Sequence, residues 1–245
     1  MKGYRSLIVI ACILLSISIA IYVIHYLIFH DLHHIFIYMV GDLAFLPLEV
    51  LIVGIVVERI LSKREKEEKL QKLNMVIGAF FSEVGNHLLA TFFNASDNRE
   101  IMLINLNVTT DWKEGEFKRA KDLVNNQKKT KFDKVSLSEL RAFLLSKRAF
   151  MLALIENPNL LEHERFTDLL LAVFHLTEEL ESRPSLDNLP PKDIDHINSD
   201  MDRAYRSLVY EWLDYILHLK TNYPFLYSHY LRIHPFQPHP SAIIQ

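Results

Sequence analysis

Apolar side chains fill two long stretches near the start of the chain and then recur at helical spacing almost to its end. Residues 7–29 form the first stretch, a run of 23 residues without an aspartate, glutamate, lysine or arginine. A helix needs about 20 such residues to cross a hydrocarbon layer about 30 Å thick, so the run predicts a membrane span. A cleaved secretory signal is not expected, because its apolar core is typically only about 7–15 residues long.

The second apolar stretch follows the motif FHDLHH and is longer than a bilayer requires. As one helix it would extend about 40 Å at about 1.5 Å per residue. Gly41 and Pro47 are natural places for a bend. We therefore expect an interfacial helix at about 34–40 and a spanning helix at about 43–60, with Asp42 as the N-terminal cap of the second helix.

Basic residues flank both expected spans on one side of the membrane. Lys2 and Arg5 precede the first span, six basic residues between positions 59 and 72 follow the second, and the short loop between the spans has none. By the positive-inside bias, both termini are cytoplasmic and the loop faces outward. The sequence thus predicts a multi-pass protein of the cell inner (plasma) membrane, with the lipid bilayer as a partner.

Two carboxylates stand on the second apolar stretch. Glu49 lies seven residues after Asp42, close to two helical turns, so both are expected on one helix face. An ionised side chain near the bilayer centre costs roughly 2.5–3.5 kcal/mol, so Glu49 should be protonated, paired, or turned toward a cavity or another helix. One hypothesis makes both acids pore or ion-binding residues of a homo-oligomer.

The alternative for these acids is structural. Glu49 would be a neutral acid that is hydrogen-bonded to Ser16 or Ser18, or to backbone groups freed by Pro47. Asp42 would then only cap a helix.

A cluster of titratable residues occupies the expected outer loop. It consists of His30, Asp31, His33 and His34. Such a cluster is a candidate for sensing external pH or for binding a divalent cation. Placement at the membrane interface alone also accounts for it.

After the second span the pattern is helical throughout. We expect a linking helix or short coiled coil at 62–93, a cytoplasmic helical domain at 94–233 and a flexible tail at 234–245. In the linking helix, apolar residues recur at spacings of three and four, which favours either a self-association seam or the inner face of the domain: Leu70, Leu73, Ile77, Phe80 and Val84. The fold class is all-α: an N-terminal transmembrane helical hairpin, a long linking helix and a cytoplasmic helical bundle.

Local signals predict the helices of the domain. Asp111 is expected to cap one helix, Ser136 and Glu139 form a capping-box pattern, and Pro191 fits the first turn of the longest helix. The segment 97–112 reads equally well as strand or helix and stays unassigned. The expected helices span about 112–125, 137–155, 162–182, 191–221 and 225–232.

Composition and motifs point away from several classes of protein. A formal net charge of −3 argues against a dedicated nucleic-acid-binding protein. The single cysteine excludes an intrachain disulfide and a thiolate metal cluster. We find no phosphate-binding glycine loop and no nucleophile motif, and we expect neither an enzyme nor a cofactor.

Twelve histidines nevertheless invite a metal hypothesis. Three pairs have spacing suited to one helix face: Glu83 with His87, His175 with Glu178, and Asp193 with His196. None reproduces the Glu-x-x-His repeats of a di-iron bundle. We therefore predict no metal site, and expect these residues to cap helices or to pair on the surface.

Several segments resemble a family of prokaryotic membrane proteins to which no activity is attached. They are HDLHHIFIYMVGDLAFLPLEV, KLNMVIGAFFSEVG, NPNLLEHERFTDLLLAVFHLTEEL and YEWLDYILHLKTNYPFLYS. The resemblance covers most of the chain and implies two spans and a C-terminal helical cytoplasmic domain. It brings no catalytic residue or ligand with it.

A weaker resemblance links the hairpin to mitochondrial calcium uniporter pores. Those pores also combine two spans, a coiled coil, and acidic residues with a proline near the outer end of the second span. This sequence lacks their tryptophan and their close acid-x-x-acid-proline order, and its coiled coil would follow the hairpin. The likeness is one of architecture and does not establish function.

Two functions therefore remain open from the sequence. The first is a homo-oligomeric assembly that conducts or binds ions through Asp42 and Glu49. The alternative is a membrane-anchored scaffold or signalling partner, whose helical domain binds a cytoplasmic protein that the sequence does not identify.

Overall fold

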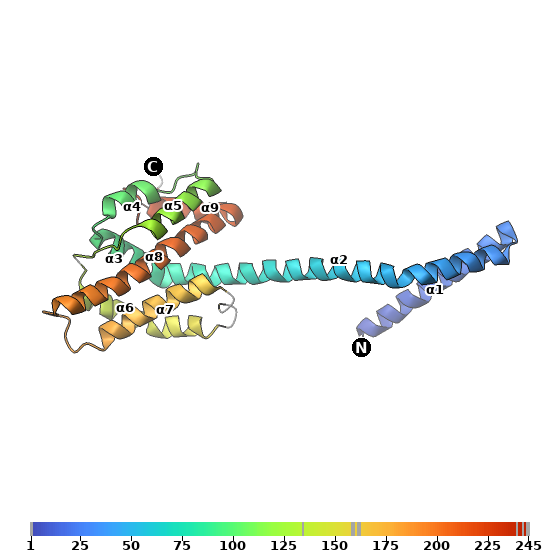
Figure 1. Ribbon diagram of the computed structural model, residues 1–245, viewed down its shortest axis with the longest axis horizontal. Helices are drawn as coiled ribbons and strands as arrows, with labels where there is room; N and C mark the ends of the chain where they lie inside the picture. Colours follow the sequence, from blue (N-terminus) through green and yellow to red (C-terminus); the bar gives the residue numbers. More distant parts are fainter. Residues whose placement is uncertain are drawn as a thin grey trace. The chain divides into compact units, whose positions relative to one another are not determined.

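The computed structural model describes residues 2–133, 135–157, 160, 163–238, 240–241 and 243, and over these residues the chain is all-α (Figure 1). Outside the helices, one isolated bridge joins Ser96 to Phe132 within the described residues. The all-α prediction is confirmed. The chain divides into two compact units, Met1–Lys66 and Glu67–Gln245.

The first unit is a helical hairpin. It contains α1 (Lys2–Phe29) and most of α2 (Leu32–Phe80). Between the helices, His30 adopts a left-handed backbone conformation with φ of 52°, which reverses the chain in two residues. Apart from the half-buried Ile35, the large apolar side chains from position 8 to position 61 are exposed, from 41% at Tyr26 to 68% at Leu43.

The predicted division of the second apolar stretch is wrong. Instead of helices at 34–40 and 43–60, α2 continues without a break through Gly41 and Pro47. Pro47 removes one helical hydrogen bond and crowds the carbonyl four residues earlier, but the remaining helical bonds on both sides keep α2 continuous. Asp42 consequently lies inside a helix and caps nothing. The cap of α2 is Asp31, whose carboxylate accepts a hydrogen bond from the His34 N–H at 3.1 Å.

The second unit is a bundle assembled around one long helix. Its helices are the end of α2, a π-helical turn η1 (Phe81–Gly85), α3 (Asn86–Ala95), α4 (Arg99–Leu106), α5 (Glu114–Asn126), α6 (Leu137–Ile155), α7 (Glu164–Glu181), α8 (Pro191–Asn222) and α9 (Pro224–Ile233). Helix α8 packs against α3, α5, α7 and α9, and Figure 1 shows it (orange) between α5 and α7. Trp212, Tyr205 and Leu208 on α8 are buried in the common core.

The apolar seam after the second span belongs to this core. Leu73, Ile77, Phe80 and Val84 are all buried within the bundle, while Leu70 is exposed. The four buried residues of the seam therefore form part of the inner face of the domain, as one of the two interpretations predicted.

Several predicted helix boundaries are confirmed, and one cap is not. Ser136 accepts a hydrogen bond from the Glu139 N–H at 3.3 Å, and Pro191 opens α8. The unassigned segment 97–112 contains α4. Asp111 is not the cap of the following helix, because α5 starts two residues later than that cap requires. There, the Lys113 N–H donates to Glu116 at 2.8 Å.

The start of the predicted flexible tail is part of the core. Phe236 is buried, with ring centroids 5.0 Å from Phe93 and 5.0 Å from Trp212. His234 is buried beside them, and burial lowers its pKa to about 4. The prolines around these residues favoured a loose segment. The Phe236 ring nevertheless packs against Phe93 and Trp212, and the His234 ring packs against Trp212, so these contacts hold the segment in the core.

Candidate functional site

Two adjacent helices bring two histidines and two carboxylates together in the second unit. His175 and Glu179 lie one helical turn apart on α7, and His196 and Asp200 lie one turn apart on α8. Residues four apart share a helix face, so each helix presents one imidazole and one carboxylate. The segment 182–190 joins the two helices, and the end of α7 faces the start of α8.

In the cluster, each imidazole nitrogen lies close to an oxygen of both carboxylates. Asp200 Oδ2 lies 3.4 Å from His196 Nε2 and 3.7 Å from His175 Nε2. Glu179 Oε2 lies 3.4 Å from His196 Nε2, and Glu179 Oε1 lies 3.9 Å from His175 Nε2. His175, His196 and Asp200 each place a ligand atom within 4.8 Å of the other two. We call these four residues the α7–α8 cluster.

Asp200 forms the buried base of the cluster. Its side chain is 2% exposed, whereas those of His175 and His196 are 44% and 50% exposed. Its Oδ2 atom is buried without a hydrogen-bond partner among the described residues. A buried carboxylate oxygen without a partner carries a desolvation cost, and here that oxygen faces the two imidazoles.

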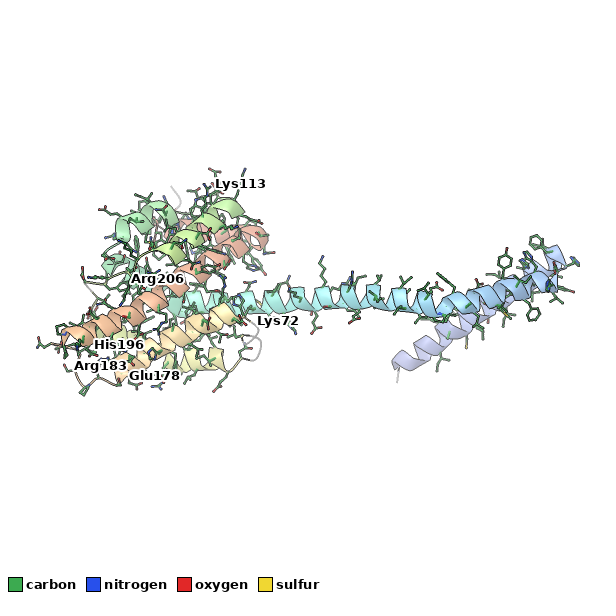
Figure 2. All side chains as sticks on the ribbon, in the orientation of Figure 1. Lys72, Lys113, Glu178, Arg183, His196 and Arg206 are labelled. Atoms are coloured by element: carbon green, nitrogen blue, oxygen red, sulfur yellow. The ribbon has the colours of Figure 1, made fainter. Side chains whose placement is uncertain are left out.

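Arginines hold the carboxylates of the cluster in place. Arg183 binds Glu179 Oε2 at 2.8 Å and clamps Asp193 with two bonds of 2.9 and 2.6 Å. Arg203 Nη1 lies 3.3 Å from Asp200 Oδ1. Figure 2 shows Arg183 and His196 at the same end of the bundle, where α7 and α8 lie side by side.

Arg183 lowers the pKa of two carboxyl groups in or beside the cluster. The hydrogen bond from Arg183 lowers the pKa of Glu179, and the nearby charges of Arg183, His196 and His175 act in the same direction against burial. Arg183 likewise lowers the pKa of Asp193. The charges of the arginine and of the two imidazoles therefore favour the ionised form of Glu179.

Sequence reasoning found the two histidines but paired them with other carboxylates. Its pairs were His175 with Glu178 and Asp193 with His196. In the structure Glu178 is exposed outside the cluster and Asp193 is held by Arg183. The signal that could have found the cluster is the spacing of four residues in His175-x-x-x-Glu179 and in His196-x-x-x-Asp200. The two pairs lie on consecutive helices, and the short segment between these helices makes them neighbours in space.

The third predicted pair does not form a site either. Glu83 instead pairs with Lys147 at 2.8 Å, and the His87 ring packs on Phe143 with centroids 4.0 Å apart.

The two acids predicted to line a pore, Asp42 and Glu49, are both exposed on α2. Neither Asp42 nor Glu49 has a hydrogen bond or an ion pair with a residue that the structure describes. The proposed pairing of Glu49 with Ser16 is not formed, because the Ser16 hydroxyl donates to the Cys12 carbonyl at 2.8 Å. Their spacing along one continuous helix keeps both acids on a common face.

The residues of the predicted outer loop take mostly structural positions. Asp31 caps α2, and His30 occupies the left-handed turn position. The His34 ring lies 6.3 Å from His25 and 4.7 Å from Tyr38. Among the described residues, the loop histidines and Asp31 do not form a group of three close ligand atoms as the α7–α8 cluster does.

Comparison with known proteins adds a family. The family described as "Uncharacterized protein MJ1433, C-terminal helical domain" matches residues 69–232, and "MJ1433, N-terminal helical domain" matches residues 2–61. The protein "Uncharacterized protein MJ1433" of Methanocaldococcus jannaschii is 43% identical over 248 residues, which cover 100% of this chain and 98% of the relative. No solved structure matches the chain.

Proposed function

The chain belongs to the MJ1433 family, and from that premise we propose that it is an integral membrane protein that holds its helical domain at the cytoplasmic face of the cell membrane. The observation that carries the proposal is the exposure of the first unit. Two helices are long and apolar enough to cross a membrane, with mean hydropathy of 2.6 and 2.2 in their most apolar windows, and none of either window is buried within the chain.

The magnitude of this exposure favours a lipid environment. Burial of one Val, Leu, Ile or Phe side chain contributes about 1.5–3 kcal/mol. Many side chains of this kind are exposed on α1 and α2. At about 1.5–3 kcal/mol each, the free energy that their burial would contribute exceeds the 5–15 kcal/mol that typically keeps a domain folded. A soluble monomer would therefore associate or aggregate through this surface.

Labelling of single cysteines in sealed vesicles tests the topology. Cys12→Ser removes the one native cysteine, and His33→Cys or Glu178→Cys then introduces a site in the loop or on α7. A membrane-impermeant maleimide should modify the His33→Cys variant only from the outer side. It should modify the Glu178→Cys variant only from the cytoplasmic side.

Extraction provides the matching control for membrane integration. The chain should stay with the membrane in alkaline carbonate and leave it in detergent. Release by carbonate, or labelling of both variants from the same side of intact vesicles, would contradict the two-span arrangement.

The acidic face of α2 supports a more specific role, an ion-binding or ion-conducting homo-oligomer. Asp42 and Glu49 stand exposed on the otherwise apolar segment 35–57 of α2, and an ionised acid in lipid costs roughly 2.5–3.5 kcal/mol near the centre. Self-association that turns Glu49 away from lipid offsets this cost. Several copies are needed, because two spans per chain do not enclose a pore.

Subunit number and flux together test this role. In lipid nanodiscs, native mass spectrometry should find four or more chains per particle. The Glu49→Gln variant should keep that number while cation flux into liposomes changes at least several-fold. Leu51→Ala, on the opposite face of the same helix, is the control and should leave flux unaltered. A monomer or dimer, or equal flux from wild type and Glu49→Gln, would refute it.

The helical domain also supports a scaffold role. Its α4 helix leaves Ile101 and Ile104 exposed, the latter at 79%, although neighbouring Met102 and Leu106 are buried in the core. Exposed apolar residues on a folded surface are suited to a protein partner. In this alternative the same cytoplasmic protein should bind the full chain and the helical domain alone.

A further inference from the structure

We propose that the α7–α8 cluster binds one divalent transition-metal ion of the zinc class. His175, His196 and Asp200 would be its ligands, and Glu179 or a water molecule would complete the coordination. The cluster lies wholly in the helical domain, so the proposal is independent of whether the hairpin conducts ions.

The spacing of the donor atoms is close to that of a coordinated metal. Bonds of about 2.0–2.1 Å in tetrahedral geometry separate neighbouring ligand atoms by about 3.4 Å. Asp200 Oδ2 already lies 3.4 and 3.7 Å from the two imidazole nitrogens. Both rings are about half exposed, so small side-chain rotations complete the approach without moving either helix.

Asp200 is the anchor of the proposed site. Burial prevents its Oδ2 from binding bulk water, and no described group donates to that oxygen. Its other oxygen, Oδ1, forms an ion pair with Arg203 Nη1 at 3.3 Å. Ligand carboxylates in metal sites are commonly oriented by partners outside the coordination sphere, and Arg203 is such a partner through its charge.

Glu179 is arranged as a fourth or outer ligand. Arg183 occupies its Oε2 atom, while Oε1 remains directed toward His175 at 3.9 Å. Arg183 is itself fixed by Asp193, so the glutamate is held at the rim of the cluster. A strong guanidinium bond at Oε2 leaves one oxygen for a metal, which favours monodentate or water-mediated coordination.

The ligand types indicate which metal fits. Imidazole nitrogens suit zinc, iron, cobalt, nickel and copper, whereas magnesium and calcium prefer oxygen ligands. Two histidines and one or two carboxylates therefore select a transition metal. Since the ligands come in pairs from two helices, the bound ion would join α7 to α8 and stabilise the bundle.

Cobalt(II) is a suitable probe because its visible absorption reports coordination by protein ligands. The tag-free full chain in nanodiscs should bind one Co²⁺ that the His175→Gln/His196→Gln double variant does not bind, or binds at least tenfold more weakly. Excess Zn²⁺ should displace the cobalt signal. The control is His229→Ala, which removes an exposed histidine of α9 away from the cluster and should bind like the wild type.

Thermal unfolding separates loss of the site from loss of the fold. Zn²⁺ should raise the midpoint of the wild type and of His229→Ala, and should leave the midpoint of the double variant unchanged. Without metal, the double variant should melt cooperatively, since both replaced rings are half exposed. Asp200→Asn should also lose the zinc response.

Two results would overturn the proposal. One is equal Co²⁺ binding by the wild type and by a folded double variant, which would place the metal elsewhere, for example at the loop histidines. The other is a wild type that binds neither Co²⁺ nor Zn²⁺, in which case the cluster is a set of histidine–carboxylate contacts only.

Discussion

Glu211 is a carboxylate buried in α8 outside the α7–α8 cluster. Its side chain is buried, and neither of its oxygens has a hydrogen-bond partner among the described residues. Burial raises the pKa of Glu211 to about 7, and the charge of Asp214 adds to the rise against the opposing charges of Arg165 and Lys121. The folded chain thus keeps this acid protonated over a pH range in which the unfolded chain ionises it.

This difference predicts a pH-dependent gain in stability from Glu211→Gln. As pH rises from about 4.5 to about 7, the unfolded chain loses the proton first, so stability falls. A shift of this size corresponds to about 3 kcal/mol at about 1.4 kcal/mol per pKa unit. Chemical unfolding in detergent should therefore show the variant more stable than the wild type at pH 8, and similar to it at pH 4.5.

The exposed Glu178 offers the matching control for that measurement. Glu178→Gln should change stability by less than about 0.5 kcal/mol at both pH values, as surface substitutions usually do. If Glu211→Gln changed the free energy of unfolding by the same amount at both pH values, the protonation argument would be wrong. The effect would then come from a change in packing, which does not depend on pH.

At the scale of the element, the π-helical turn η1 determines which side chains around Phe80 and Phe81 face the core of the bundle. In it the Asn86 N–H bonds to the Phe81 carbonyl, five residues earlier. One extra residue in the turn lets consecutive side chains, Phe80 and Phe81, both face the core. Their rings meet edge to face with centroids 5.5 Å apart.

Gly85 in this turn is required for close packing, and Gly85→Ala is therefore expected to destabilise the domain. A Cβ atom there would lie 2.5 Å from Phe81 Cδ1 and 3.1 Å from Phe80 Cε1, and both rings are fully buried. Overpacking of this kind costs about 1–3 kcal/mol. The midpoint of thermal unfolding should fall by several degrees.

Gly115 provides the control, because it is also helical but a Cβ atom there would meet nothing within 4 Å. Gly115→Ala should stabilise α5 by up to about 1 kcal/mol through helix propensity. If both substitutions raised the midpoint, the backbone at η1 would be free to adapt and the packing argument would be wrong.

At the scale of the whole molecule, the second unit has the properties of an independent domain. Its core is formed by residues from Leu73 to Phe236, all within Glu67–Gln245. The two family matches meet between residues 61 and 69, close to the same boundary. A fragment of residues 67–245 should therefore fold without detergent.

Purification of that fragment tests the division. It should be soluble and should unfold cooperatively, with Trp212 fluorescence reporting loss of the core. Residues 1–66 fused to a soluble carrier should instead require detergent. Aggregation of the fragment, or unfolding without a cooperative transition, would show that the bundle depends on the hairpin.

The all-helical fold class and the starts of α6 and α8 were predictable because they follow from local patterns. Ser136 and Pro191 carry start signals that act within one helical turn. The continuity of α2 was not predictable from Gly41 and Pro47, since residues with low helix propensity are tolerated where enough other backbone bonds remain. The burial of Phe236 depends on contacts with residues far away in the chain.

By itself, the sequence determined that the chain is all-helical, that its first 61 residues are unusually apolar, and that acids stand on the second apolar stretch. Each of these properties is local, encoded in residues a few positions apart. The tertiary structure alone decided which carboxylate meets which histidine. His175 and Asp200 lie 25 positions apart in the sequence and 3.7 Å apart in space, because α7 and α8 pack side by side in a register that many contacts set together.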